Sequence, residues 1–259
     1  MAKERKVQKR NFCLFCGSTG MSKEHIWSDW LSDVLPTTDV HNQNITYSPF
    51  HLKADVGAER VTKQGSLLQR KIRKVCVRCN TGWMSTIVDK AKPIAMRLIR
   101  GELIDLTESD MRHLASWIAI CTIVAEFTEP GTIGISQEEI NEVYNTQAPP
   151  SYWSICIGRY KGKDWAPYRY HHRGGKVVSG DNIAADIFQN NFAHHKVDGY
   201  QITIYTLGSL AIFCSSSTSP IFPNTYTPDK MLKIWIPDNS LNWSSLIRLK
   251  DQDMAVLIS

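Results

Sequence analysis

Four of the seven cysteines form two Cys-x-x-Cys pairs, Cys13/Cys16 and Cys76/Cys79. A Cys-x-x-Cys turn presents two thiolates to one ion, and two such turns complete the four-sulfur tetrahedron that structural zinc prefers. The pairs therefore predict one closed Zn2+ site that joins two distant parts of the chain. The alternative is four reduced thiols without a metal.

A histidine and two oxygen-bearing side chains lie close to these pairs in the sequence. Glu24 and His25 follow the first pair, with His25 nine positions after Cys16, and Asn80 comes directly after Cys79. If one zinc ion joins the pairs, these three side chains approach a common point. Carboxylate and amide oxygens suit a hard cation such as Mg2+, and a neutral imidazole can take a proton from water. Together these groups suit the hydrolysis of a phosphodiester.

The arrangement resembles the HNH endonuclease family, whose ββα-metal core often includes a zinc-binding treble clef. Residues 13–17, 22–26, 75–80 and 82–85 carry the resemblance, which covers about residues 11–95. It implies that His25 is the general base and that Glu24 and Asn80 bind a catalytic Mg2+ or Mn2+ ion. It also implies that the four paired cysteines bind a structural Zn2+.

Three positions depart from the family pattern. Glu24 stands where Asp is common, and Ser28 replaces a common Pro. Ser28 is also expected to cap the short helix that Pro36 ends. Lys71 stands where a middle Asn usually steadies the loop, nine residues before Asn80. These departures favour an alternative function, a zinc-binding module that binds nucleic acid or a protein partner without catalysis.

Positive charge is concentrated in the first hundred residues, which carry 18 Lys and Arg against 8 Asp and Glu, whereas residues 101–259 carry 12 against 17. One cluster is the basic N-terminal arm, residues 3–10. The other contains no acidic residue and consists of Arg70, Lys71, Arg73, Lys74 and Arg78. Such clusters attract phosphates, so we expect a nucleic-acid partner, DNA rather than RNA. A solvated surface is the alternative interpretation.

The patterns predict an α+β fold in which a small zinc-bound lobe precedes helices and a β-rich C-terminal half. We expect a nuclease-like domain over residues 1–100 and an accessory domain over 101–259 for target recognition, dimerisation or regulation, which leaves a homodimer open. Helical periodicity covers 82–100, 108–127 and 136–144, with Pro93 expected to kink or split the first. Strands are expected at 152–159, 201–205, 209–215 and 233–236, a short helix at 184–193, and a loop excursion with a strand or two at 37–68.

Composition narrows the class of protein. With 42% hydrophobic and 21% charged residues, the chain is not expected to be disordered. Its longest nearly apolar run, residues 117–125, is too short for a membrane span, and its basic start leads into no apolar signal segment. An odd cysteine count argues against a disulfide framework, so we expect a cytoplasmic protein. The three unpaired cysteines are expected to be buried thiols: Cys121, Cys156 and Cys214.

Overall fold

The computed structural model combines helices with an antiparallel β-sheet, so the α+β expectation is confirmed. It describes residues 12–36, 42–46, 60–64, 67–128, 130–179, 196–219, 226–237 and 242–258. The basic arm at 3–10 and the helix expected at 184–193 lie outside these residues. The N-terminal elements are β1 (Glu24–His25), the 3-10 helix η1 (Asp29–Asp33), β2 (Asn42–Thr46), β3 (Arg60–Gln64), the 3-10 helix η2 (Leu67–Gln69) and β4 (Lys71–Ile72).

The middle of the chain is helical. It contains α1 (Val77–Cys79), the π-helical turn η3 (Asn80–Met84), α2 (Ser85–Ile99), α3 (Glu108–Glu126), the 3-10 turn η4 (Pro130–Thr132) and α4 (Gln137–Thr146). Pro93 does not split α2, which continues through it to Ile99. The helical path is instead interrupted at Gly82, whose φ and ψ of −98° and −113° are not helical.

The C-terminal half is built on one antiparallel sheet in the order β6-β7-β8-β5-β9. Its elements are β5 (Ser154–Arg159), β6 (Tyr168–Ser179), β7 (Lys196–Leu207), β8 (Leu210–Ser217), β9 (Leu232–Lys233), the 3-10 turn η5 (Trp243–Ser245) and α6 (Asp251–Ile258). Three of the four expected strands are present, and β7 is longer than the sequence pattern indicated. Of the fourth, expected at 233–236, only Lys233 lies in a strand, β9.

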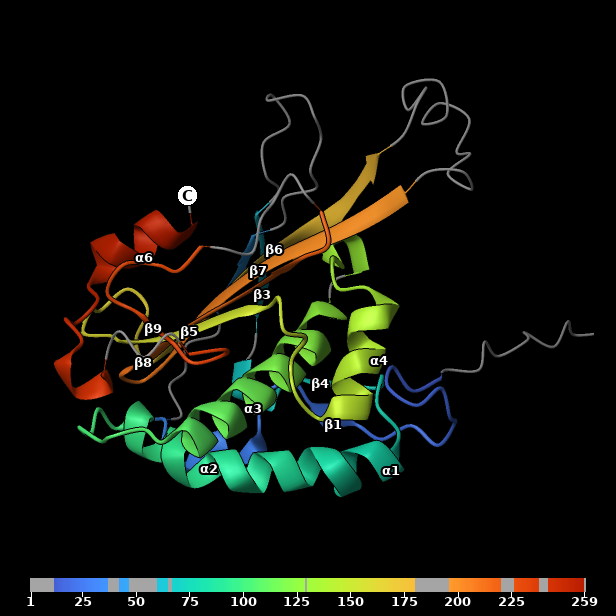
Figure 1. Cartoon of the computed structure of the whole chain (residues 1–259), viewed down its shortest axis with the longest axis horizontal. Helices are drawn as coiled ribbons and strands as arrows, with labels where there is room; N and C mark the ends of the chain where they lie inside the picture. The colour runs from blue at the N-terminus through green and yellow to red at the C-terminus, as the bar shows by residue number, and fades with distance from the viewer. Residues whose placement is uncertain are drawn as a thin grey trace, which may run out of the picture.

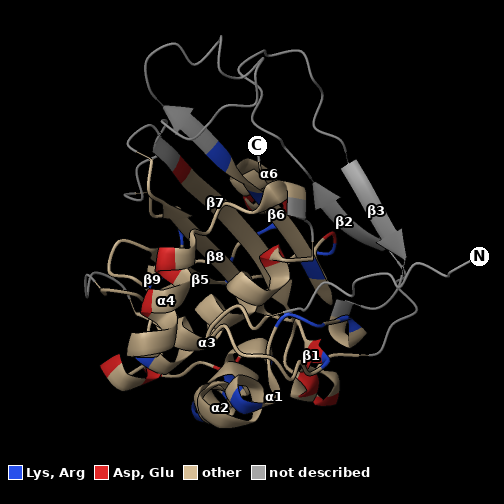
Figure 2. Ribbon diagram, turned by 90° about the vertical axis from the view of Figure 1, so that its right-hand side faces the viewer, with Lys and Arg blue, Asp and Glu red and all other residues tan. Residues whose placement is uncertain are grey.

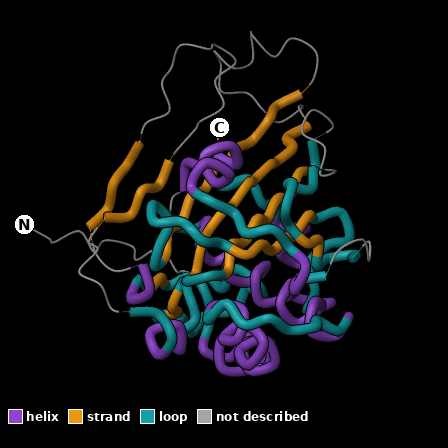
Figure 3. Tube along the Cα trace, turned by 90° about the vertical axis from the view of Figure 1, so that its left-hand side faces the viewer, coloured by secondary structure: helices purple, strands orange, loops and turns teal. Residues whose placement is uncertain are grey.

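The sheet is covered on both faces (Figures 1 and 3). In β8, Leu210 and Ile212 belong to the large core that includes α3, whereas Ala211 and Phe213 belong to a smaller core that includes Met254 of α6. Successive strand residues point to opposite faces, so this alternation places α3 on one side of the sheet and α6 on the other.

Helix α3 is the central support of the larger core. Its N-terminus carries a reciprocal capping box in which Asp110 N–H donates to the Thr107 hydroxyl and Thr107 N–H donates to the Asp110 carboxylate. From Leu114 to Glu126 every side chain is buried. A helix that is buried around its whole circumference can contact both the sheet and α2, which lies beside it in Figure 1.

The cysteine-containing lobe packs directly on this core. Trp27 is fully buried, and its ring centroid lies 4.4 Å from that of Tyr205 on β7. The Ser28 hydroxyl accepts a hydrogen bond from Trp117 Nε1 of α3 at 3.0 Å, so it does not cap a helix as expected. Residues from both expected domains therefore share one hydrophobic cluster across residue 100.

Candidate metal centre and adjoining cavity

Two local turns shape the cysteine pairs. In the first, Gly17 N–H donates to Cys13 O at 3.0 Å, and Gly17 has a φ of +66°, which glycine adopts without steric cost. In the second, Cys76 caps α1, because its Sγ accepts from Cys79 N–H at 3.5 Å. Backbone hydrogen bonds join the two turns, including one from Leu14 N–H to Lys74 O at 2.9 Å.

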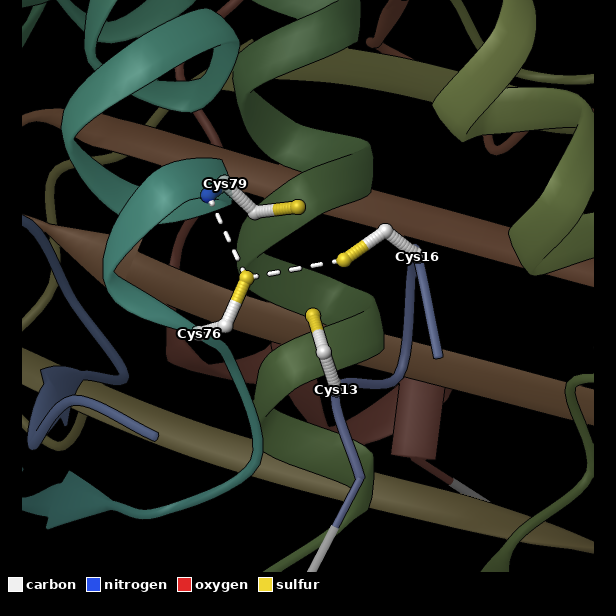
Figure 4. A group of neighbouring side chains, drawn as sticks. All are labelled: Cys13, Cys16, Cys76 and Cys79. Carbon is white, nitrogen blue, oxygen red and sulfur yellow. Dashed lines mark hydrogen bonds between the residues drawn. The ribbon is translucent and has the colours of Figure 1, made fainter. Parts of the chain in front are cut away.

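The four sulfur atoms converge on one point (Figure 4). All lie within 4.8 Å of one another, and Cys16 Sγ is 3.5 Å from Cys76 Sγ. A tetrahedral Zn–S4 centre with bonds of about 2.3 Å separates its sulfurs by roughly 3.8 Å, so this cluster fits the ion after small side-chain adjustments. Cys13, Cys16, Cys76 and Cys79 can therefore hold a structural metal such as zinc.

The thiols differ in how readily they ionise. Burial opposes ionisation of Cys16, but hydrogen bonds from the side chain and backbone of Ser18 outweigh it and lower the pKa of this thiol to about 6. Burial raises the pKa of Cys79, and the Trp83 indole offsets part of that rise. Cys16 is thus largely a thiolate at neutral pH before any metal binds, while ionisation of Cys79 depends on the ion.

A cavity of about 610 Å³ brings together Glu24, His25 and Asn80, the last of which directly follows Cys79. The two-stranded sheet of β1 and β4 supplies Glu24 and His25, and Asn80 begins the turn directly after the last cysteine. Side chains of η1, α2 and α3 complete the walls. Acidic and basic residues occur close together around β1 (Figure 2).

Glu24 is the buried acid of this cavity. Burial raises its pKa to about 7, and a hydrogen bond with the Asn80 side chain and the positive charge of Lys71 offset only part of the rise. Asn80 Nδ2 also lies 3.3 Å from the Ser22 hydroxyl, which it donates to. Because the Asn80 amide nitrogen makes these contacts, its Oδ1 is left to bind another group. A carboxylate oxygen and an amide oxygen are donors that suit a divalent cation.

His25 lies beside a second acid. Its Nε2 is 3.3 Å from Asp29 Oδ1, at the first residue of η1. Burial lowers the pKa of His25, and the opposing negative charge of Asp29 raises it in part. Burial and the positive charge of Lys71 thus favour the neutral form of the imidazole. Since Nε2 contacts Asp29, Nδ1 is the nitrogen that remains to accept a proton.

The basic residues at 70–78 have different neighbours. Lys71 lines the cavity, whereas Arg70 is half-buried near Tyr170. Burial lowers the pKa of Arg70, and the charge of Tyr170 acts in the opposite direction. Lys74 Nζ lies 6.0 Å above the ring of Phe127, and Arg78 contacts the Cys16 thiol. Arg73 is exposed on its segment. Of the five, Lys71 alone borders the cavity.

Sequence reasoning missed several cavity residues. Asp29 is four residues after His25, a spacing that could have indicated contact within a helical turn, although the turn formed is η1. Lys92 of α2 and Cys121 of α3 also line the cavity, and no local pattern marks them. The expectation that Cys121, Cys156 and Cys214 are buried is confirmed.

Comparison with protein-family models, curated proteins and solved structures gave no match. Within the described part of the chain, none of the helices combines the length and apolar character that crossing a membrane requires.

Proposed function

We propose that this chain is a metal-dependent endonuclease of the HNH type that hydrolyses phosphodiester bonds in nucleic acid. One observation carries the proposal: the neighbouring residues Glu24 and His25 line one cavity together with Asn80, which is 55 positions after His25 and directly follows Cys79 of the four-cysteine cluster. We further propose that Zn2+ at the cysteines stabilises a treble-clef arrangement of β1, β4 and the helical segment after Cys76. DNA, rather than RNA, is the proposed substrate, and the cytoplasm the proposed location.

In this mechanism His25 Nδ1 takes a proton from a water molecule as the water oxygen bonds to phosphorus and the bond from phosphorus to the leaving sugar oxygen breaks. Asp29 stabilises the imidazolium that results, because its carboxylate already contacts Nε2. Glu24 and Asn80 would hold Mg2+ or Mn2+, which supplies electrostatic stabilisation to the phosphate and the leaving oxygen. The leaving oxygen then takes a proton from solvent.

The decisive comparison is cleavage of plasmid DNA by the wild type and by His25→Ala, with added Mg2+ or Mn2+. We expect His25→Ala to lose about 10²–10⁴ of the cleavage rate, the usual contribution of a general base. His113→Ala is the matched control, because His113 lies on α3 and does not line the cavity. Equal cleavage by wild type and His25→Ala, with equal zinc content, would exclude His25 as the base.

A second candidate function is a zinc-binding module that binds nucleic acid or protein without cutting. The observation that favours it is Lys71, which lies beside His25 at the position where the HNH family commonly has Asn. This candidate predicts salt-sensitive binding without cleavage in any divalent metal. Metal-dependent cleavage that is lost in His25→Ala would exclude it.

A further inference from the structure

Lys71 and His25 are direct partners in the small sheet. The register pairs His25 with Lys71 and Glu24 with Ile72. Directly opposite residues on an antiparallel pair have Cβ atoms about 4.5–5.5 Å apart and point to the same face. The side chains of Lys71 and His25 therefore project from the same face of the sheet, and both line the cavity.

Within the described residues, the side chain of Lys71 makes no hydrogen bond or ion pair, whereas its backbone pairs with His25. Its side chain is exposed, so its ammonium group is not committed to holding the fold. Its positive charge nevertheless acts on both neighbours, since it favours the charged form of Glu24 and disfavours protonation of His25. An exposed cation that lines a cavity with these neighbours is suited to bind an anion that enters from solvent.

A second lysine approaches the same cavity from another element. Lys92 of α2 borders the cavity, and its Nζ lies 5.8 Å above the ring of Trp30, which fixes the direction of the side chain. The two lysines come from β4 and α2, which are separate elements of the chain. An anion between them could contact cations from two sides.

We propose that Lys71 binds a non-bridging oxygen of the phosphate that His25 acts on, and that Lys92 contacts the same or the adjacent phosphate of the nucleic-acid backbone. This inference rests on the proposed nuclease function and assigns the substrate-binding part of its site. In this role Lys71 supplies a charge that offsets the negative charge on the non-bridging phosphate oxygens during attack. In this proposal, the lysine that replaces the middle Asn of the HNH pattern binds phosphate, so the replacement does not remove catalysis.

The test measures binding before cleavage. A fluorescent DNA duplex is titrated with zinc-loaded protein in EDTA-free buffer lacking Mg2+ and Mn2+, at several salt concentrations. Loss of one phosphate contact reduces the salt slope by about 0.9 and weakens binding roughly five- to tenfold at 0.1 M salt. We expect this of Lys71→Met, whereas Lys71→Arg should retain wild-type binding because it keeps the charge.

Lys161→Met is the matched control. Lys161 is exposed and adjoins Tyr160 in the core on the α6 side of the sheet, so this variant has the same charge change away from the cavity. Equal binding and equal salt slopes in Lys71→Met and Lys161→Met would overturn the inference, as would a wild type that binds no duplex. Thermal unfolding of each variant verifies that the fold is intact.

The cleavage assay separates this inference from the proposed function. If binding depends on Lys71 but the wild type cleaves nothing with any divalent metal, the nuclease proposal fails and the phosphate contact remains. If the wild type cleaves DNA and Lys71→Met cleaves with the same kcat and KM, the nuclease proposal remains and the role of Lys71 is refuted. If the nuclease proposal and the role of Lys71 are both correct, Lys71→Met lowers kcat and raises KM.

Discussion

Metal affinity at the cavity is predicted to depend on pH through Glu24. Burial raises the pKa of this carboxyl group to about 7 in the metal-free protein. A divalent cation binds the carboxylate and not the acid, so the apparent affinity is proportional to the ionised fraction of Glu24. That fraction is about nine-tenths at pH 8 and about one-tenth at pH 6, so we expect the affinity for Mn2+ to fall about tenfold over this range.

Calorimetric titration of zinc-loaded protein with Mn2+ at pH 6, 7 and 8 measures this dependence. At pH 7 about half of the Glu24 groups are protonated, so binding should release about half a proton per ion, which appears as a dependence of the heat on the buffer used. Glu24→Gln should bind Mn2+ weakly and without this pH dependence. Asp29→Asn is the matched control, because it removes another acid of the cavity and should retain the dependence.

The same affinity at pH 6 and pH 8 would refute the reasoning, as would a tenfold change that persists in Glu24→Gln. The first result would mean that Glu24 does not bind the ion or that it is ionised throughout the range. The second would assign the titrating group elsewhere. Either result would also remove the main support for a catalytic cation held by Glu24 and Asn80.

Two further predictions concern stability. Cys79→Ser should lose the structural metal and unfold at a markedly lower temperature, because structural zinc can contribute on the order of 10 kcal/mol to the free energy of folding. The control Cys156→Ser should retain full metal content. Elemental analysis measures the metal, and calorimetry measures the unfolding temperature. Burial raises the pKa of Glu126 to about 8, which is above the pKa of this group in the unfolded chain. The stabilisation that Glu126 gives to the folded state is therefore present at low pH and is lost as the pH rises through 8. In urea titrations, the stability of wild type relative to Glu126→Gln should therefore fall by about 1 kcal/mol between pH 7 and pH 9, and no change would show that Glu126 is already ionised at pH 7.

The features that were predictable from sequence are those determined by local chemistry. The capping box at Ser136 and Glu139 requires residues three positions apart, and both of its hydrogen bonds are present. The two Cys-x-x-Cys turns likewise form locally, and the known preference of zinc for four thiolates then indicated that they meet. In each case a short spacing and one type of interaction were enough to predict the feature from the sequence.

The features that were not predictable depend on contacts between distant residues. Strands β1 and β4 have two residues each, which is too short for any alternating pattern to indicate a strand. Ser28 looked like a helix cap, but a Trp117 indole 89 positions away donates to its hydroxyl instead. Pro93 looked like a helix breaker, yet packing of α2 against α3 maintains the helix through it.

The contacts of buried Glu126 likewise could not be predicted from the sequence. Its carboxylate accepts hydrogen bonds from Gly134 N–H at 2.7 Å and from Ile135 N–H, and its Oε1 is 3.7 Å from His172 Nε2 of β6. In the sequence, His171 and His172 are only two adjacent histidines, and no strand was expected at their position. Nothing local indicates that an acid at the end of α3 lies beside one of them, because the contact exists only after the sheet has packed on α3.

Some residues of the cavity are close to the cysteines in the sequence and others are not, which explains why its candidate catalytic residues were easier to predict than the rest of its lining. Glu24, His25 and Asn80 are each within nine residues of a cysteine, so joining the cysteine pairs limits how far apart these side chains can be. Lys92 and Cys121 have no such link and reach the cavity only through the packing of α2 and α3 on the lobe. Changes at the cysteines should therefore disturb the whole site, whereas substitution of Lys92 should alter substrate contacts while leaving the metal centre intact.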